Sequence, residues 1–183
     1  MKDRNLINKF YRNNRGSVSI EFVFMLIFLA FIFAFLADLV IIRSTMGKLD
    51  NVSYSLVNIL RERTQLYDRE ARINDQDLKE FEQLAKRLVY GDKESKKDLY
   101  IVLEHWQEGN SSSKRNSSQC KPYRKIDELS QLSPRSEINN ERKIPLYQVT
   151  LCVETNSFFK ALLLDKANQS WGMIRSSSFS VSR

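Results

Sequence analysis

An apolar run near the N-terminus dominates the hydrophobic pattern of the chain. From Ile20 to Ile42 nearly every residue is apolar, whereas the residues up to Gly16 are polar and basic. As an α-helix that rises ~1.5 Å per residue, this run of about 23 residues spans roughly 35 Å, enough to cross a hydrocarbon core of ~30 Å with some tilt. The pattern therefore predicts a transmembrane helix over residues 17–42.

A helical stripe continues beyond this segment. Between residues 43 and 67, apolar residues recur at spacings of three, four and seven positions: Val52, Leu56, Ile59, Leu60 and Leu66. This stretch contains no proline, so we expect one long helix that leaves the membrane and packs on the following domain. Gly47 is the position at which this helix would bend.

A second apolar face predicts another helix at about residues 75–90. Asn74 or Asp75 can cap its N-terminus, Asp77 lies in its first turn, and Gly91 follows its last turn. The apolar face consists of Leu78, Phe81, Leu84, Ala85, Leu88 and Val89.

Three stretches have the composition of β-strands. Residues 99–106 are β-branched and aromatic, residues 145–154 alternate between two faces, and residues 171–181 alternate serine with apolar residues near their end. The intervening residues 107–143 are rich in serine, asparagine and charge, which predicts a long flexible loop. A membrane helix, a second helix and about three strands predict an α+β fold, with one domain over residues 43–183.

The net charge of +7 does not indicate nucleic-acid binding. More than half of it lies in residues 1–16, and acids and bases are interspersed in the rest of the chain. Basic residues within ~15–20 positions of a membrane helix stay on the cytoplasmic side. We therefore expect a cytoplasmic leader and an extracytoplasmic domain, periplasmic in a Gram-negative-type cell. A plain secretory signal is disfavoured. The apolar region of such signals is only ~7–15 residues long, which is shorter than the run from Ile20 to Ile42.

Glu21 lies just inside the apolar run. A carboxylate costs on the order of 2.5–3.5 kcal/mol near the bilayer centre and less near the interface. The helix dipole stabilises a carboxylate near the N-terminus by only ~0.3–1 kcal/mol, which is less than this cost. Glu21 also lies one residue beyond the capping-box spacing from Ser17, so capping alone does not explain it. We therefore expect Glu21 to have a functional partner.

The order of these residues resembles the N-terminus of type IV prepilins. A basic leader ends at Gly16, Ser17 follows, and a carboxylate at Glu21 precedes a long apolar helix. The opening RGSVSIEFVFML, with the later PLYQVTLCVE and SSSFSVSR, is most similar to the TadF-like (TadE/TadF) pseudopilins of the tight adherence (Tad/Flp) pilus system.

This resemblance implies a structural role in pilus assembly, adherence and biofilm formation. A prepilin peptidase would cut after Gly16, and the new amine of Ser17 would pair with Glu21 of a neighbouring subunit. The implied partners are this peptidase, other pilins or pseudopilins and the Tad assembly platform in the inner (cytoplasmic) membrane.

Cysteine usage fits an extracytoplasmic domain. Cys120 and Cys152 are the only two cysteines, which is compatible with one disulfide. The chain has no CxxC motif, and His105 has only Glu104 and Glu108 near it, so we expect neither a metal site nor a cofactor. No nucleophile–base pair or P-loop is visible, so we expect no enzymatic activity and no small-molecule substrate.

A second function class stays open. An uncleaved, single-pass membrane-anchored periplasmic binding or sensor protein would have the same helix and outer domain but would keep residues 1–16. The first residue of the mature protein separates the two classes. A start at Ser17 favours the pilin interpretation, and a start at Met1 counts against it.

Overall fold

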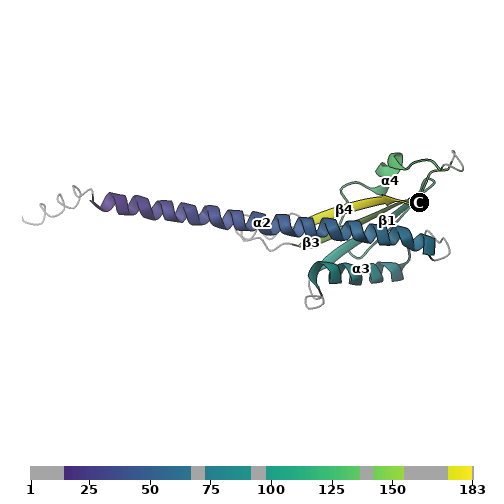
Figure 1. Ribbon diagram of the computed structural model, residues 1–183, viewed down its shortest axis with the longest axis horizontal. Coiled ribbons are helices and arrows are strands. Elements are labelled where there is room, and N and C mark those ends of the chain that lie inside the picture. The colour runs from purple at the N-terminus through teal and green to yellow at the C-terminus, as the bar shows by residue number, and fades with distance from the viewer. Residues whose placement is uncertain (1–14, 67–72, 92–97, 137–141, 155–172, 183) are drawn as a thin grey trace, which may run out of the picture. The chain divides into compact units, whose positions relative to one another are not determined.

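The computed structural model describes residues 15–66, 73–91, 98–136, 142–154 and 173–182. They belong to two compact units, Met1–Ile41 and Ile42–Arg183. Helix α2, Arg15–Leu66, begins in the first unit and ends in the second. The second unit adds helix α3, Asp75–Tyr90, and a four-stranded sheet, which confirms the α+β class expected from the sequence (Figure 1).

Both helices follow their predicted patterns. α2 continues through Gly47 as one helix. α3 begins where the Asp77 carboxylate accepts a hydrogen bond of 2.8 Å from the backbone N–H of Asn74. It ends at Gly91, which has a φ of 76° and donates its N–H to the Arg87 carbonyl at 2.8 Å. Glycine adopts a positive φ without steric cost, so it suits this C-terminal cap.

The sheet has the strand order β2-β1-β3-β4, and all neighbouring strands are antiparallel. The strands are β1 (Leu99–Gln107), β2 (Asn110–Arg115), β3 (Leu146–Glu154) and β4 (Met173–Val181). β1, β3 and β4 match the three expected strands, whereas β2 is an additional strand. Its polar sequence suits an edge position, where only β1 pairs with it.

A two-residue turn joins β1 to β2. Gln107 pairs with Asn110, so Glu108 and Gly109 form the turn, with φ values of 49° and 85°. Turns with positive φ at both central positions match the twist of antiparallel strands. The turn explains why a polar stretch that we expected to be a loop folds back on β1 as a strand.

The main core lies between the sheet and the two helices. Alternate residues of β1 and β3 are fully buried on this face, among them Ile101, Leu103, Val149 and Leu151. They pack with buried residues from the apolar stripes of α2 and α3: Leu49, Val52, Leu56, Val57, Leu60, Phe81, Ala85 and Val89. Burial of these side chains is the main stabilising contribution to the second unit.

A thinner layer covers the opposite face of the sheet. It contains α4, Ile126–Leu129, and the short 3-10 helix η1, Ser130–Leu132. Ile126 packs with Trp106 and Leu146 of the sheet. The described part of residues 107–143 therefore differs from the flexible loop that we expected. The physical reason is that β1 has apolar or aromatic residues on this face too, Tyr100, Val102 and Trp106, so this face also needs cover.

Hydroxyl groups line the contact between α2 and β4. Ser53 Oγ lies 2.9 Å from Ser176 Oγ and 2.7 Å from Ser178 Oγ. About two turns further along α2, Arg61 Nη1 donates to Ser180 Oγ at 3.3 Å. These five residues form what we call the serine seam, which fixes the position of α2 along β4.

Candidate functional site

The candidate processing site lies at the start of α2. The helix begins at Arg15, so Gly16 and Ser17 fall in its first turn, and residues 1–14 of the predicted leader lie outside the described residues. Glu21 follows Ser17 at the i, i+4 spacing, which places the two positions on one face of the helix. Glu21 is exposed on the first unit. Gly16, Ser17 and Glu21 thus share one element, whereas the sequence pattern placed Gly16 in the leader and the start of the helix at Ser17.

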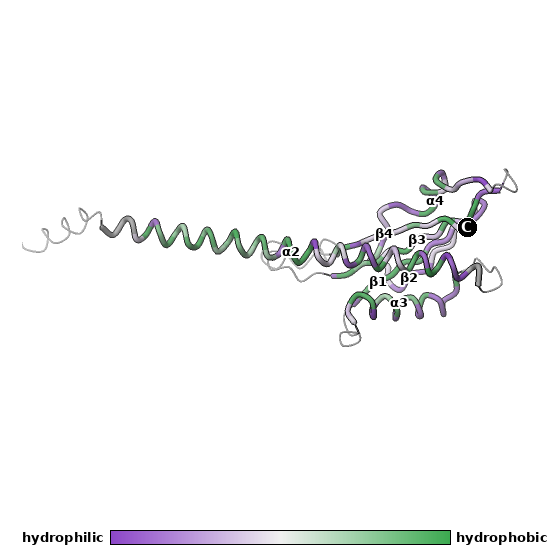
Figure 2. Tube along the Cα trace, in the orientation of Figure 1, coloured by the Kyte–Doolittle hydropathy of each residue, from purple (hydrophilic) through white to green (hydrophobic). Residues whose placement is uncertain are grey.

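The first unit exposes an apolar surface. Phe24, Met25 and Phe28 are 66%, 70% and 66% exposed, and hydrophobic colouring runs along this part of α2 in Figure 2. A helix that is apolar all round is suited to lipid rather than to water. Within the described residues, α2 is the one helix that is long and apolar enough to cross a membrane.

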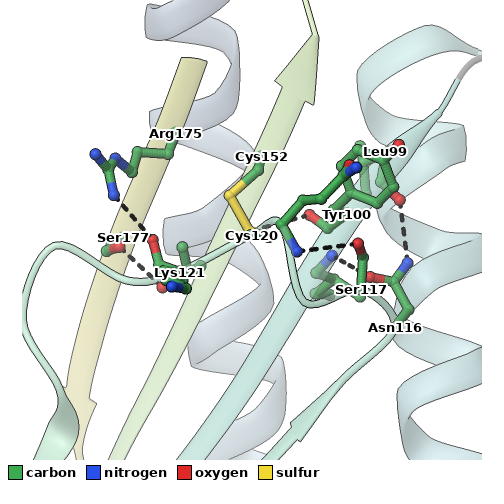
Figure 3. The surroundings of a disulfide bond; sticks show 12 residues. Leu99, Tyr100, Asn116, Ser117, Cys120, Lys121, Cys152, Arg175 and Ser177 are labelled. Atoms are coloured by element: carbon green, nitrogen blue, oxygen red, sulfur yellow. Dashed lines mark hydrogen bonds between the residues drawn. A yellow bond between two sulfur atoms is a disulfide. The ribbon is translucent and has the colours of Figure 1, made fainter. Parts of the chain in front are cut away.

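A disulfide links Cys120 to Cys152 of β3 (Figure 3). The Cα atoms of the two cysteines are 5.7 Å apart, and both side chains are buried. Just before the disulfide, the Asn116 side-chain oxygen accepts from the Ile101 N–H at 2.9 Å, and its side-chain nitrogen donates to the Leu99 carbonyl at 3.1 Å. The Asn116 hydrogen bonds join the covering layer to β1, and the disulfide joins it to β3.

An exposed loop of positive charge follows the disulfide. We name it the basic loop, Lys121–Lys125. Lys121, Arg124 and Lys125 are exposed, and Tyr123 is 61% exposed. Arg175 of β4 holds the loop, because its guanidinium lies 4.5 Å from the Tyr123 ring centroid and Nη1 donates to the Lys121 carbonyl at 3.3 Å. The Tyr123 hydroxyl donates to the Arg175 carbonyl at 3.3 Å.

Two polar side chains are buried beneath α4. Glu104 of β1 faces Gln148 of β3 in the register, and they are 6% and 2% exposed. Gln148 Nε2 donates to the Arg124 carbonyl at 3.1 Å. Gln148 Oε1 and Glu104 Oε2 have no hydrogen-bond partner within the described residues. Such a pair is satisfied when the carboxyl group is protonated and acts as a donor.

Burial raises the pKa of Glu104 to about 7. Burial is the largest cause of this raised pKa and the nearby Asp127 carboxylate adds to it, whereas the cations of Arg115 and Lys125 and a backbone hydrogen bond from Ile126 oppose the rise. The sequence alone did not reveal this environment, because it depends on the layer that covers β1. The signal present in the sequence is an acid in the middle of an apolar strand.

His105 occupies the other face of β1. It is buried, its ring centroid lies 5.0 Å from that of Tyr147, and burial lowers its pKa. In the parts of the chain that the structure describes, no group of three or more His, Cys, Asp or Glu residues is arranged to hold a metal ion. The surroundings of His105 are therefore those of a core residue.

The comparison with protein families covers nearly the whole chain. A family model described as "TadF: Putative tight adherence pilin protein F" matches residues 9–183. The match includes Gly16, Ser17 and Glu21 and extends through β4. No curated protein and no solved structure matches the chain. With its apolar N-terminal helix, its α+β second unit and this match, the chain belongs to the TadF family of tight adherence pilin proteins.

Proposed function

We propose that this chain is a minor pilin or pseudopilin of the Tad (Flp) pilus that a prepilin peptidase cuts after Gly16. The family match carries the proposal, because it spans residues 9–183 and so includes both the leader junction and the second unit. The order of Gly16, Ser17 and Glu21 at the start of an apolar helix supports it. The role is structural and serves pilus assembly, adherence and biofilm formation.

The junction has the properties that cleavage at a membrane surface requires. Gly16 has no side chain, so a membrane-embedded peptidase can approach the backbone closely on the leader side of the bond. Hydrolysis of the peptide bond between Gly16 and Ser17 leaves a carboxylate on the leader and a free amine on Ser17. The apolar helix that follows keeps this new amine close to the membrane.

The new amine supplies a partner for Glu21. A carboxylate within lipid costs up to ~2.5–3.5 kcal/mol near the bilayer centre, and a nearby opposite charge offsets this cost. In the proposed assembly the Ser17 amine of one subunit pairs with Glu21 of its neighbour. This pairing favours subunits whose leader has been removed, since an uncut chain carries no amine at Ser17.

We place the protein in the inner membrane, with its N-terminus in the cytoplasm and its second unit in the periplasm. The basic leader supports this orientation by the positive-inside rule. The Cys120–Cys152 disulfide supports it too, because disulfides persist in oxidising compartments. The partners of this role are the peptidase, other pilins or pseudopilins and the Tad assembly platform.

N-terminal sequencing of the membrane-extracted protein tests the proposal. The mature chain should begin at Ser17, and Gly16→Leu should remain at full length because its side chain blocks access of the peptidase to the backbone. Asn13→Leu is the matched control, since it adds the same side chain to the leader away from the junction and should be processed normally. A wild-type chain that begins at Met1 would contradict the proposal and favour an uncleaved anchored protein.

A further inference from the structure

The covering layer contains a segment that is fixed at both ends. We call it the strap, residues 124–132, which include α4 and η1. Before the strap, the Cys120–Cys152 disulfide attaches the chain to β3. After it, Ser133 Oγ donates to the Ile144 carbonyl at 2.6 Å. The strap can therefore leave the sheet while the residues on either side of it stay attached.

Two buried polar side chains of the sheet hold the first part of the strap. Gln148 Nε2 donates to the Arg124 carbonyl at 3.1 Å, and Glu104 accepts a hydrogen bond from the backbone N–H of Ile126. Apolar burial adds little, because α4 buries only Ile126 and Leu129 and η1 buries no residue. The two hydrogen bonds are therefore a large part of what keeps the strap on the sheet.

The same two side chains face each other across the sheet. Glu104 and Gln148 are partners in the β1–β3 register, where the Cβ atoms of opposite residues lie ~4.5–5.5 Å apart. Within the described residues, Glu104 Oε2 and Gln148 Oε1 have no hydrogen-bond partner. A protonated carboxyl group can donate to an amide oxygen, whereas a carboxylate offers only acceptors. Loss of the proton therefore leaves two buried oxygens without a donor, which is costly away from water.

We propose that the strap is a pH-dependent switch that opens when Glu104 loses its proton. In the closed strap the protonated carboxyl group donates to Gln148 Oε1 and accepts from the Ile126 N–H. An ionised carboxylate gains water as a donor only when the strap leaves the sheet. Opening also uncovers Trp106 and Leu146, which pack with Ile126 in the closed state.

The charged groups around Glu104 come from the strap and from β2. Asp127 of α4 favours retention of the proton, whereas Lys125 of the strap and Arg115 of β2 oppose it. β3 contributes the neutral Gln148. Burial is the largest cause of the raised pKa, so the pKa of Glu104 should be about 7 under the closed strap and near its ordinary value of 4.5 under the open one.

Linkage between the proton and the strap gives the size of the effect. Between these two pKa values the open state releases the proton that the closed state keeps, so the equilibrium constant for opening rises with pH. For Glu104, values of about 7 and 4.5 correspond to a rise of about tenfold from pH 6 to pH 8.

Hydrogen–deuterium exchange of the full-length protein in a non-ionic detergent measures the opening. After correction for the intrinsic exchange rate, amides of the strap should lose about tenfold in protection from pH 6 to pH 8. They should also exchange faster than the amides of β3 at both pH values, because β3 opens only when the second unit unfolds. Equal protection of the strap and β3 would contradict the proposal, since the strap would then open only with the whole unit.

Two variants identify the group that titrates. Glu104→Gln should remove the pH dependence of the protection of the strap, because glutamine donates to Gln148 Oε1 at every pH. Glu154→Gln is the matched control, since this glutamate is exposed at the end of β3, and it should keep the tenfold change. A pH-independent strap in the wild type, or a tenfold change that persists in Glu104→Gln, would overturn the proposal.

Discussion

Replacing Glu104 by glutamine should stabilise the second unit, and the gain should increase with pH. Burial raises the pKa of Glu104 from its ordinary value of 4.5 to about 7. As pH rises through this window, the unfolded chain releases the proton while the folded chain keeps it. The free energy of unfolding therefore falls between these two pKa values, and the loss is complete above the higher one.

The size of the effect follows from the pKa difference. At ~1.4 kcal/mol for each pKa unit, the loss for the wild type approaches about 3 kcal/mol at pH 8. Glutamine has nearly the same shape, stays neutral at every pH and offers an N–H donor beside Gln148 Oε1. The two proteins should therefore have similar stability at about pH 4, and Glu104→Gln should be more stable by about 2–3 kcal/mol at about pH 8.

Urea unfolding of the full-length protein in a non-ionic detergent measures this difference. Tryptophan fluorescence reports the transition, because Trp106 is buried in the same strand as Glu104. Glu154→Gln is the matched control, since this glutamate is exposed at the end of the adjacent β3 and should change the stability by less than ~0.5 kcal/mol. A stability gain in Glu104→Gln that is equal at low and high pH would refute the reasoning.

Three further changes test other parts of the molecule. Cys152→Ser should lower the free energy of unfolding by ~3–4 kcal/mol and remove any mobility difference between reduced and non-reduced samples, whereas two alkylatable thiols in the wild type would contradict the disulfide. Leu56→Ala should cost ~2–5 kcal/mol in urea unfolding, because this side chain is fully buried, and the half-exposed Ile59→Ala should cost clearly less. Glu21→Ala and Glu21→Gln should both insert into the membrane but impair piliation in electron micrographs; normal pili would remove the proposed role of the charge.

The helices and three of the strands could be predicted because their signals are local. Asn74, Asp77 and Gly91 mark the ends of α3 through backbone hydrogen bonds within a few residues. The apolar face between these ends needs only helical periodicity to be visible. The alternation in residues 145–154 likewise depends on neighbouring positions alone, and it became β3.

β2 and the covering layer could not be predicted because they depend on distant partners. The six polar residues of β2 form a strand by pairing with β1, and Gly109 in the turn was the one local signal for that hairpin. The layer around Ile126 exists because Trp106 of β1 and Leu146 of β3 need cover on the face away from the main core. The apolar residues on the second face of β1 were a signal that something covers this face, but they did not show which segment does so.

The candidate sites divide in the same way. Gly16, Ser17 and Glu21 are close in sequence, so their order was readable without a structure. The buried Glu104 and Gln148 come from two different strands, and the basic loop depends on Arg175 of a distant strand. Sequence patterns contain each of these residues but do not show which of them meet.

The serine seam suggests how the second unit would carry mechanical load. A pull along the axis of α2 would load its hydroxyl contacts in shear, since Ser53 and Arg61 bind successive serines of β4. Alternate residues of a strand are ~6.7 Å apart, so a slip of one repeat would bring Ser53 to another serine hydroxyl. The hydrogen bonds broken by such a slip can re-form at the next serine. Under load, α2 would therefore move along β4 in steps instead of separating from it in one event.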